Sequence, residues 1–352
     1  MCKVGICGHF GENKNLLNGQ TIKTKILTEE LKNMLGEKAV ITVDTYGWKH
    51  SPVKLLIKCY LLIKKCENIV ILPAQNGVRV FVPLFLALNK IFNRKLHYVV
   101  IGGWLPNLLA KNDKLKERLK KFDGIYVETH SMVKALQKLG LENIKYLPNF
   151  KRLDILQDDE LIYATDEPYK LCTFSRVTKE KGIEDAINAV KNINNNLGRI
   201  VYTLDIYGQV DDNYRARFEE LKKAFPNYIS YKGKVNYKDS VKVLKNYFAL
   251  LFPTYHKTEG IPGTIIDAYA AGLPVLASRW DSANEIIEHG LTGFIYDFEK
   301  RTRLEDLLIN IAKTPDNINK MKKNCLKRAR QYTPEKVVGD FITYLQEEPT
   351  RN

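Results

Sequence analysis

Short apolar runs alternate with longer amphipathic stretches from the first residues of the chain to about residue 333. In the first half, strands are predicted at residues 3–7, 39–44, 68–72, 96–101, 124–127 and 144–147, and helices at 20–35, 53–65, 80–91, 114–120 and 131–139. Strands that alternate with helices in this way pair in parallel, because each helix returns the chain to the same end of the sheet. The pattern predicts an α/β fold with parallel sheets wrapped by helices.

The length of 352 residues suits two domains better than one, and the 45% share of hydrophobic residues is enough for two cores. Residues 148–168 interrupt the alternation, since they include the acidic run Asp158–Glu160 and few periodic apolar positions. A second series of strands and helices follows. We therefore expect two α/β domains joined near residues 148–168.

Residues 250–278 of the second series predict a strand, a loop, a helix and another strand. Pro262 suits the first turn of this helix, because an amide at that position would have no partner in the helix. The next amides, at Gly263 and Thr264, point out of the helix start, where the helix dipole favours an anion. The helix entry is therefore a candidate anion site.

Two carboxylates flank this helix entry. Glu259 lies upstream in the loop, and Asp267 lies about one turn inside the helix. A diphosphate at the helix start would have one carboxylate towards each side, which favours a sugar on one flank and a ribose on the other. An ordinary surface helix with exposed acids explains the same pattern equally well.

Two cations follow the strand predicted at residues 171–174. Arg176 comes directly after this strand, and Lys181 follows in the next turn. Ligands bind at the carboxyl ends of the strands of open α/β sheets, where these two cations could neutralise a pyrophosphate. A solvated run of loop charges is the competing interpretation, because this chain is rich in lysine.

These two segments, in this order and with this separation, resemble the retaining glycosyltransferases of family 4, of the type that acts in bacterial polysaccharide biosynthesis. The pattern of that family is a Glu, seven residues, a second Glu, then Ala and a turn of small residues. Glu259 and residues 267–275 follow it, with Asp267 in place of the second Glu. The resemblance covers most of the chain and implies the GT-B fold, in which two Rossmann-like domains face each other across a cleft.

The resemblance also implies a role for each matching residue. Glu259 would contact the donor sugar, Asp267 the ribose hydroxyls, and Arg176 and Lys181 the charge of the diphosphate. The backbone of one loop would bind the diphosphate itself, namely that of Gly260, Ile261, Pro262, Gly263 and Thr264. Gly208 would lie beside the nucleotide and Val235 beside the base. Because Asp267 is one methylene shorter than Glu, its ribose contact could be looser or pass through a water.

In this family the first domain binds the acceptor and the second binds the donor. The resemblance therefore implies an acceptor domain at residues 1–155, completed by a returning helix within residues 334–352, and a donor domain at residues 156–333. The loop after the first strand resembles the glycine-rich entry loop of the family and has no GxGxxG spacing, which argues against a dinucleotide cofactor.

Six residues of the first domain are candidates for an acceptor or phosphate site, namely Gly8, His9, Gly19, Gln20, Trp104 and His130. Trp104 follows Gly103 at another strand end, where it could present an aromatic edge to an acceptor or pack as part of a structural turn. His9 and His130 are the remaining histidine candidates. Each is more often a structural histidine than a catalytic one.

The net charge of +15 lies entirely in residues 1–152, which hold 26 Lys and Arg against 11 Asp and Glu. Residues 51–66 and 81–98 are both apolar and basic, so they are candidates for peripheral contact with an anionic membrane. Ordinary core-facing helices with solvated lysines are the competing interpretation. No zinc spacing or RNA-binding signature is present, which argues against nucleic acid.

The six cysteines show no metal-ligand spacing, and no signal peptide or membrane-spanning stretch is readable, so we expect reduced thiols and a cytoplasmic protein, at most peripheral at the inner face of the plasma membrane. The leading hypothesis is a retaining hexosyltransferase that moves a sugar, most simply from a UDP-sugar, to a glycan or polyprenyl-linked acceptor in surface polysaccharide or capsule synthesis. This chemistry predicts no cofactor and no metal. A sugar-nucleotide epimerase of GT-B architecture and a catalytically silent donor-binding subunit are the alternatives.

Overall fold

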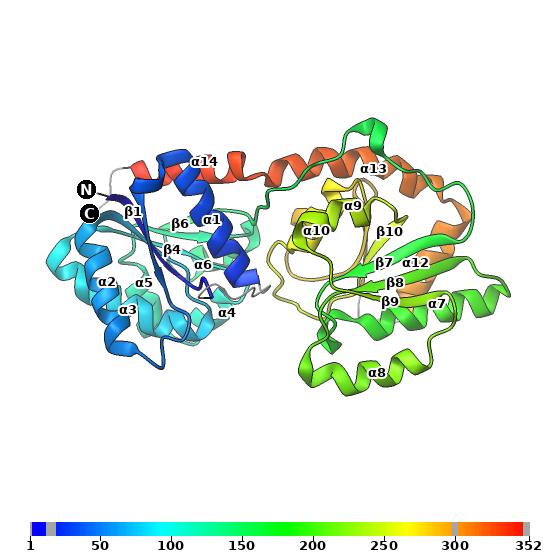
Figure 1. Ribbon diagram of the computed structural model, residues 1–352, viewed down its shortest axis with the longest axis horizontal. Coiled ribbons are helices and arrows are strands. Elements are labelled where there is room, and N and C mark those ends of the chain that lie inside the picture. Colours follow the sequence, from blue (N-terminus) through cyan, green and yellow to red (C-terminus); the bar gives the residue numbers. More distant parts are fainter. Residues whose placement is uncertain (1, 12–18, 298–301, 348–352) are drawn as a thin grey trace. The chain divides into compact units, whose positions relative to one another are not determined.

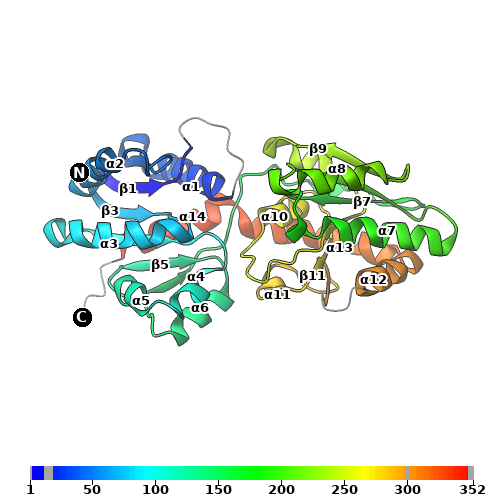
Figure 2. The ribbon, with the colours of Figure 1, turned by 90° about the horizontal axis from the view of Figure 1, so that it is seen from below.

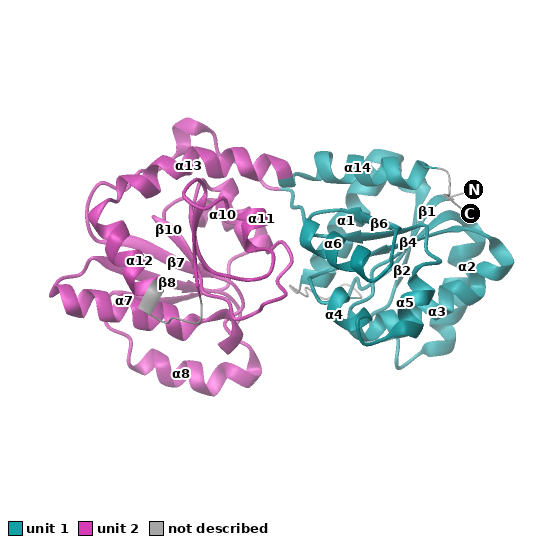
Figure 3. Ribbon diagram, turned by 180° about the vertical axis from the view of Figure 1, so that it is seen from behind, with its two compact units in different colours: residues 1–152, 332–352 teal, residues 153–331 magenta. Residues whose placement is uncertain are grey.

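The computed structural model describes residues 2–11, 19–297 and 302–347. The chain forms two compact units, unit 1 (Met1–Arg152 and Tyr332–Asn352) and unit 2 (Leu153–Gln331), which Figure 3 colours teal and magenta. Each unit contains one six-stranded sheet, and every strand pairing is parallel. Helices cover both faces of each sheet (Figures 1 and 2), so the predicted α/β class with parallel sheets is confirmed.

The sheet of unit 1 has the order β2-β1-β3-β4-β5-β6. Its strands are β1 (Cys2–Gly8), β2 (Val40–Asp44), β3 (Cys66–Ile71), β4 (Lys95–Val99), β5 (Gly124–Val127) and β6 (Ile144–Tyr146). Its helices are α1 (Gly19–Leu35), α2 (Pro52–Lys65), α3 (Gln75–Phe92), α4 (Leu105–Leu109), α5 (Asp113–Leu119), α6 (His130–Lys138) and α14 (Pro334–Gln346), with a 3₁₀ turn η1 (Glu37–Ala39).

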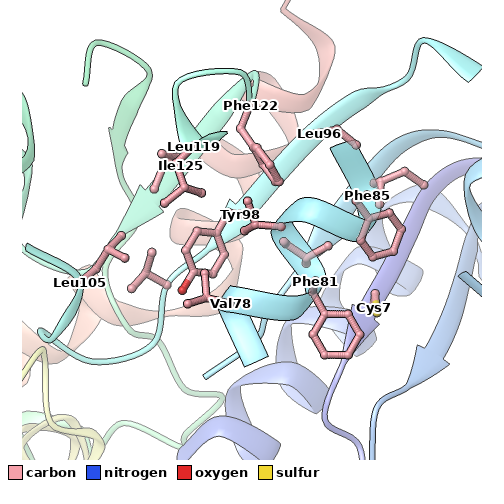
Figure 4. Close-up of a cluster of buried hydrophobic side chains, with 14 of the residues drawn as sticks. Cys7, Val78, Phe81, Phe85, Leu96, Tyr98, Leu105, Leu119, Phe122 and Ile125 are labelled. Atoms are coloured by element: carbon pink, nitrogen blue, oxygen red, sulfur yellow. The ribbon is translucent and has the colours of Figure 1, made fainter. Parts of the chain in front are cut away.

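Two apolar clusters form the core of unit 1, one on each face of the sheet. The larger one joins α2, α3, α5 and α6 to the sheet, and Figure 4 shows Phe81 and Phe85 of α3 beside Tyr98 of β4. The smaller one joins α1 and α14 to the other face, where the ring of Phe341 meets that of Tyr126 edge-on at 4.7 Å. The last helix of the chain is therefore part of the core of unit 1.

Residues 81–98 do not form one continuous helix, so only the part of this stretch that belongs to α3 stays a candidate for membrane contact. Asn93 adopts a left-handed conformation with φ of 50°, and the side chain of Asn89 accepts a hydrogen bond from the Arg94 amide at 2.6 Å. These contacts end α3 at Phe92. The residues that follow form β4, where Leu96 and Tyr98 are buried in the sheet and have no access to a bilayer.

The sheet of unit 2 has the order β12-β11-β10-β7-β8-β9. Its strands are β7 (Tyr169–Phe174), β8 (Tyr202–Tyr207), β9 (Ile229–Gly233), β10 (Ala249–Phe252), β11 (Val275–Ser278) and β12 (Gly293–Tyr296). Its helices are α7 (Ile183–Leu197), α8 (Arg215–Lys223), α9 (Ser240–Leu244), α10 (Gly263–Ala270), α11 (Ala283–Ile286), α12 (Thr302–Lys313) and α13 (Asp316–Ala329). The 3₁₀ turns are η2 (Asp158–Glu160), η3 (Lys179–Lys181), η4 (Asp212–Tyr214), η5 (Tyr237–Asp239) and η6 (Arg330–Tyr332), the last of which ends at the first residue of unit 1's second segment.

The five cysteines whose side chains are described, Cys7, Cys59, Cys66, Cys172 and Cys325, are buried and free of disulfides. Across residues 2–11, 19–297 and 302–347, none of the helices combines the length and the apolar character that crossing a membrane requires.

A buried histidine makes the stability of unit 1 sensitive to acid. His97 of β4 is hydrogen-bonded through Nε2 to Asn68 Oδ1 and through Nδ1 to Tyr126 Oη, both at 3.0 Å. Burial lowers the pKa of His97 to about 3, and the nearby charges of Lys95 and Lys145 act in the same direction. In the unfolded chain the pKa of this histidine is about 6.5. Between these two values the unfolded chain binds a proton that the folded chain does not.

We therefore expect the His97 contribution to be complete above pH 6.5 and to be lost progressively as the pH falls towards 3. At pH 5 the loss amounts to about 2 kcal/mol in the free energy of unfolding. Urea unfolding at pH 7.5 and pH 5.0 measures this loss, and a His97→Gln variant provides the comparison because it cannot take up the proton. An equal pH dependence in both proteins would contradict the assignment to His97.

Candidate functional site

The candidate site of unit 2 lies at the carboxyl ends of β7 and β10, two neighbouring strands in the middle of the sheet. The chain leaves β7 towards β8 on one side and later returns to β10 on the other side. The loops after β7 and β10 therefore separate in opposite directions. In open α/β sheets, ligands bind in the crevice that forms at such a switch point.

Lys181 and Glu259 meet across this switch point. Lys181 lies in η3, in the loop after β7, and its ammonium forms an ion pair with Oε1 of Glu259, in the loop after β10. Only 14% and 16% of the two side chains are exposed. The ammonium also lies 5.2 Å from the centre of the Phe252 ring, and Thr254 Oγ1 donates to the same Oε1 at 3.1 Å. The fold thus brings together two residues that the sequence placed in separate segments.

Two serines hold the Glu259 loop in place. Ser282 Oγ donates to the carbonyl oxygen of Glu259 at 2.9 Å, and Ser278 Oγ donates to the carbonyl oxygen of Thr254 at 2.6 Å. Neither serine was among the residues predicted for the site. Ser278 directly follows the apolar residues 275–277, which the sequence predicts as a strand. A hydroxyl at a strand end was the only sign in the sequence that this residue supports the loop.

The close approach of the two loops depends on a glycine. Gly182 has φ of 66°, and a Cβ atom at this position would lie 1.9 Å from the carbonyl oxygen of Pro253. The amide of Tyr255 donates to the carbonyl oxygen of Glu180 at 2.7 Å, which adds a direct bond between the loops. Any side chain at position 182 would force the loops apart.

Helix α10 begins beside this pair with an open amino end. The helix begins at Gly263, so Pro262 lies immediately before it and not in its first turn as the sequence predicted. The carbonyl oxygen of Pro262 accepts a hydrogen bond from the Ile265 amide at 3.0 Å. Within the part of the chain that the structure describes, the amides of Gly263 and Thr264 have no hydrogen-bond acceptor. The hydroxyl of Thr264 donates to the carbonyl oxygen of Phe174 and ties the helix start to the end of β7. Unpaired amides at a helix start are suited to binding an anion.

Gly260 and Ile261, the remaining residues of the predicted diphosphate loop, are buried between Glu259 and the helix start. The packing of these two residues therefore holds this part of the loop in place. Arg176, in contrast, is exposed beyond β7, and no carboxylate among the described residues forms an ion pair with it. Lys181 is neutralised by Glu259, so the uncompensated positive charge at this edge comes from other cations, Arg176 and the exposed Lys179 of η3 among them.

Gly208 lies at the end of β8 with φ of 136°, and a Cβ atom there would lie 1.7 Å from the carbonyl oxygen of Ser175. This contact places the β8 end directly against the residue that precedes Arg176. Val235 is half-buried in the loop between β9 and η5. Both residues therefore belong to the same edge of the sheet as the ion pair.

Asp267 faces the interior of unit 2. Its residue exposure is 3%, and its carboxylate accepts a hydrogen bond from Ser240 Oγ of α9 at 3.2 Å. The acid that the sequence placed on an open flank of the helix is thus packed between α10 and α9. The predicted ribose contact of Asp267 stays a prediction.

Three candidate residues of unit 1 lie near the carboxyl end of β1. Gly8 ends the strand, and a Cβ atom there would lie 2.7 Å from Cγ2 of Thr24 on α1. His9 Nδ1 is hydrogen-bonded to Thr21 Oγ1 at 2.8 Å, and Gln20 Nε2 donates to the carbonyl oxygen of Leu72 at 3.1 Å. Gly19 begins α1 and has open space around it. Residues 12–18 of the predicted entry loop lie outside the described residues.

Trp104 and His130 are engaged in local contacts. The indole nitrogen of Trp104 donates to the carbonyl oxygen of Ile101 at 2.8 Å, and its ring packs against the larger core cluster of unit 1. The His130 ring stacks on the Tyr146 ring with the centres 4.0 Å apart. The Trp104 turn is therefore internally bonded, whereas His130 is exposed at the start of α6.

The sequence analysis also missed a buried ion pair at the same edge of unit 1. Lys23 of α1 and Glu128, directly after β5, are joined at 2.5 Å with 3% and 4% of their side chains exposed. Lys23 precedes Leu27 and Leu31 on the buried stripe of its helix. The presence of a lysine on this buried stripe was the sign of the ion pair that the sequence offered. Among the described residues, no three His, Cys, Asp or Glu side chains gather into a metal-binding group.

Comparison with known proteins finds a family model that matches most of unit 2. Residues 158–332, nearly all of this unit, match the family model of the glycosyl transferases group 1. An uncharacterized glycosyltransferase of Methanocaldococcus jannaschii is 25% identical over 267 residues, which cover 71% of this chain and 61% of the relative. The amylovoran biosynthesis glycosyltransferase AmsK of Erwinia amylovora is 24% identical over 213 residues, which cover 59% of this chain and 49% of the relative.

The chain thus spans about half to three-fifths of the length of these curated relatives. Among solved structures, HepE of Anabaena in complex with UDP matches with a TM-score of 0.76 and 14% identity, over 97% of this chain and 99% of that chain. This match extends over both units and shows that the fold is the predicted GT-B type.

Proposed function

We propose that this chain, which matches the family model of the glycosyl transferases group 1 at residues 158–332, is a retaining glycosyltransferase. Its donor would be a UDP-sugar of the hexose type, and its acceptor a growing or lipid-linked glycan of polysaccharide biosynthesis. One observation carries the proposal: the Lys181–Glu259 pair spans the switch point of the sheet beside the open start of α10. The relative that acts in amylovoran biosynthesis and the UDP-bound HepE support the choice of acceptor class and base.

The charges at the site fit a diphosphate. Lys181 and Glu259 together are neutral, so the net attraction for an anion comes from Arg176 and from the amides of Gly263 and Thr264. An arginine binds phosphate oxygens in a fork, and helix-start amides are directed at the anion. The same groups would stabilise the negative charge that builds up on the diphosphate as the sugar leaves.

The remaining assignments follow from position. Glu259, fixed by Thr254 and by the Lys181 ammonium, would accept hydrogen bonds from sugar hydroxyls. The acceptor would attack the face of the sugar from which the diphosphate departs, which retains the configuration and needs no protein nucleophile. Unit 1 would supply the acceptor contacts, with His9 and Gln20 at the carboxyl end of β1 as first candidates.

Thermal denaturation with nucleoside diphosphates tests the donor assignment. A ligand at 100 times its dissociation constant stabilises the folded state by about 2.7 kcal/mol. We expect UDP to raise the melting temperature more than ADP, CDP or GDP do. If no nucleoside diphosphate stabilises the protein at millimolar concentration, the donor assignment is wrong.

Arg176→Ala is expected to weaken UDP binding by roughly tenfold to one-hundredfold, because hydrogen bonds to a charged group contribute about 1.5–3 kcal/mol. The side chain is exposed, so the melting temperature of the free protein should stay near that of the wild type. Isothermal titration with UDP measures the change. Arg215→Ala is the matched control, since this exposed arginine pairs with Asp212 at the start of α8 and should leave UDP affinity unchanged. Equal affinity in Arg176→Ala and wild type would remove Arg176 from the site.

A further inference from the structure

Helix α2 of unit 1 is apolar on two opposite faces. Its inner face packs into the core through Leu55, Cys59, Leu62 and Ile63. Its outer face consists of further apolar residues at helical spacing, all exposed, namely Val53, Leu56, Ile57, Tyr60 and Leu61. The exposed fractions of Val53 and Ile57 are 68% and 56%. A surface helix of a globular protein normally carries polar residues on its outer face, so this face requires an explanation.

Helix α3 lies beside α2 and extends the apolar surface. The ring of Tyr60 on α2 meets that of Phe92 on α3 edge-on at 5.4 Å. Val80 and Ile91 of α3 are exposed, Ile91 to 73%. Figure 2 shows the two helices running along the same unit. We refer to Val53, Leu56, Ile57, Tyr60, Leu61, Val80 and Ile91 as the α2–α3 surface.

The charges around the α2–α3 surface are almost all positive. Residues 45–94 contain eight Lys and Arg and a single acid, Glu67. Six of these cations lie on the two helices and have no ion-pair partner within the described parts of the chain: Lys54, Lys58, Lys64, Lys65, Arg79 and Lys90. Lys54, Lys58 and Lys65 follow one another at spacings of four and seven, so they line one flank of α2.

A cavity of about 250 Å³ opens at the start of α2. Lys54 and Lys58 line it together with His50 and Trp48. Among the described residues that line it, the one carboxylate is Asp44, which already accepts hydrogen bonds from the amides of Phe10 and Tyr46, both at 2.8 Å. The cavity therefore has a basic lining next to the apolar face of the helix.

We propose that the α2–α3 surface docks onto an anionic phospholipid bilayer. The apolar side chains would enter the boundary between head groups and acyl chains, and the lysines on the flank would face lipid phosphates. The cavity at the start of α2 would accept one phosphate-bearing head group. The proposal concerns unit 1 alone and does not rest on the glycosyltransferase function.

Charge complementarity selects this occupant. Two copies of the chain packed face to face through this surface would bring like charges together without compensation. An acidic protein would satisfy the cations but would not require the continuous exposed stripe of Val, Leu, Ile and Tyr. A bilayer with anionic head groups offers both an apolar interior and negative charge within the depth of one helix.

Co-sedimentation of the full-length protein with vesicles tests the proposal. We expect binding to vesicles of phosphatidylglycerol and phosphatidylcholine at low salt, weaker by at least tenfold in 0.5 M NaCl or with phosphatidylcholine alone. The double variant Leu56→Glu with Ile57→Glu should lose at least tenfold in binding. Leu197→Glu with Ile200→Glu is the matched control, because it adds the same two charges at exposed apolar positions of unit 2. It should lose less than threefold.

Three outcomes would overturn the proposal: no sedimentation with anionic vesicles at low salt, equal binding to neutral vesicles, or equal losses in the two double variants. Light scattering of the free protein adds a further check, since a dimer that Leu56→Glu with Ile57→Glu dissociates would identify a second copy as the occupant. UDP binding of the variant, measured by titration, reports on unit 2 separately. An unchanged UDP affinity with lost vesicle binding supports the proposal, and lost vesicle binding with an altered melting temperature of the free protein counts against it.

Discussion

Lys181→Ala is expected to lower the rate of sugar transfer by at least one-hundredfold, with the fold intact. Removal of one group that stabilises developing negative charge typically costs this much in turnover. The substitution also leaves the Glu259 carboxylate, mostly buried, without its cation. Both effects act on the leaving diphosphate and on the group that would hold the sugar. The donor-dependent rate, measured with the UDP-sugar identified by thermal denaturation, reports the loss.

Lys179→Ala is the matched control for this experiment. Lys179 lies in the same turn, η3, but is exposed, so its removal changes the local charge equally without reaching the ion pair. Glu259→Gln provides a second test, since it keeps the size of the side chain and removes its charge. We expect a loss in Lys181→Ala and Glu259→Gln and a rate within threefold of wild type in Lys179→Ala. Wild-type turnover in Lys181→Ala would refute the site assignment.

The same assay separates the alternatives for the reaction. Turnover of the UDP-sugar to an isomer without any acceptor would identify an epimerase. Tight UDP binding with no turnover of any UDP-sugar, with or without glycan acceptors, would identify a silent donor-binding subunit. Retention is read from the anomeric configuration of the product.

Gly182→Ala is expected to destabilise unit 2 by roughly 3 kcal/mol and to weaken UDP binding by at least tenfold. The added Cβ atom would lie 1.9 Å from the carbonyl oxygen of Pro253, and the residue has φ of 66°. Backbone atoms at this distance must move apart, which costs more than the left-handed conformation alone. Because Lys181 precedes this glycine, the same movement separates it from Glu259.

Gly198→Ala distinguishes the clash from the backbone conformation. Gly198 ends α7 with φ of 64°, but an added Cβ atom would meet nothing within 4 Å. We expect this variant to lose about 1 kcal/mol in the free energy of unfolding and no UDP affinity. Urea unfolding and UDP titration of both variants measure the difference. Similar losses in the two would show that the loops tolerate separation and that the close approach is unimportant.

The fold class followed from local pattern, because alternation of apolar runs and amphipathic stretches depends only on neighbouring residues. The same holds for the start of α10, where Pro262 and Gly263 specify a helix entry within a few positions. Most boundaries in unit 1 moved by no more than two residues, and the start of α3 moved by five, from residue 80 to Gln75. The Asn89 cap ends α3 at Phe92, and the last four residues of the stretch at 81–98 belong to the buried strand β4.

Local patterns in the sequence predict two parallel α/β units and place Lys181 and Glu259 after strand ends. Their contact depends on long-range pairing, because β10 lies next to β7 although the two strands are far apart in the chain. Tertiary packing also decided that Asp267 is buried and that the outer face of α2 is exposed. Apolar residues repeat at helical spacing on both faces of α2, so the sequence pattern does not indicate which face packs against the sheet. Whether a residue is buried depends on the elements that pack around it, so burial follows from the assembled sheet and its helices.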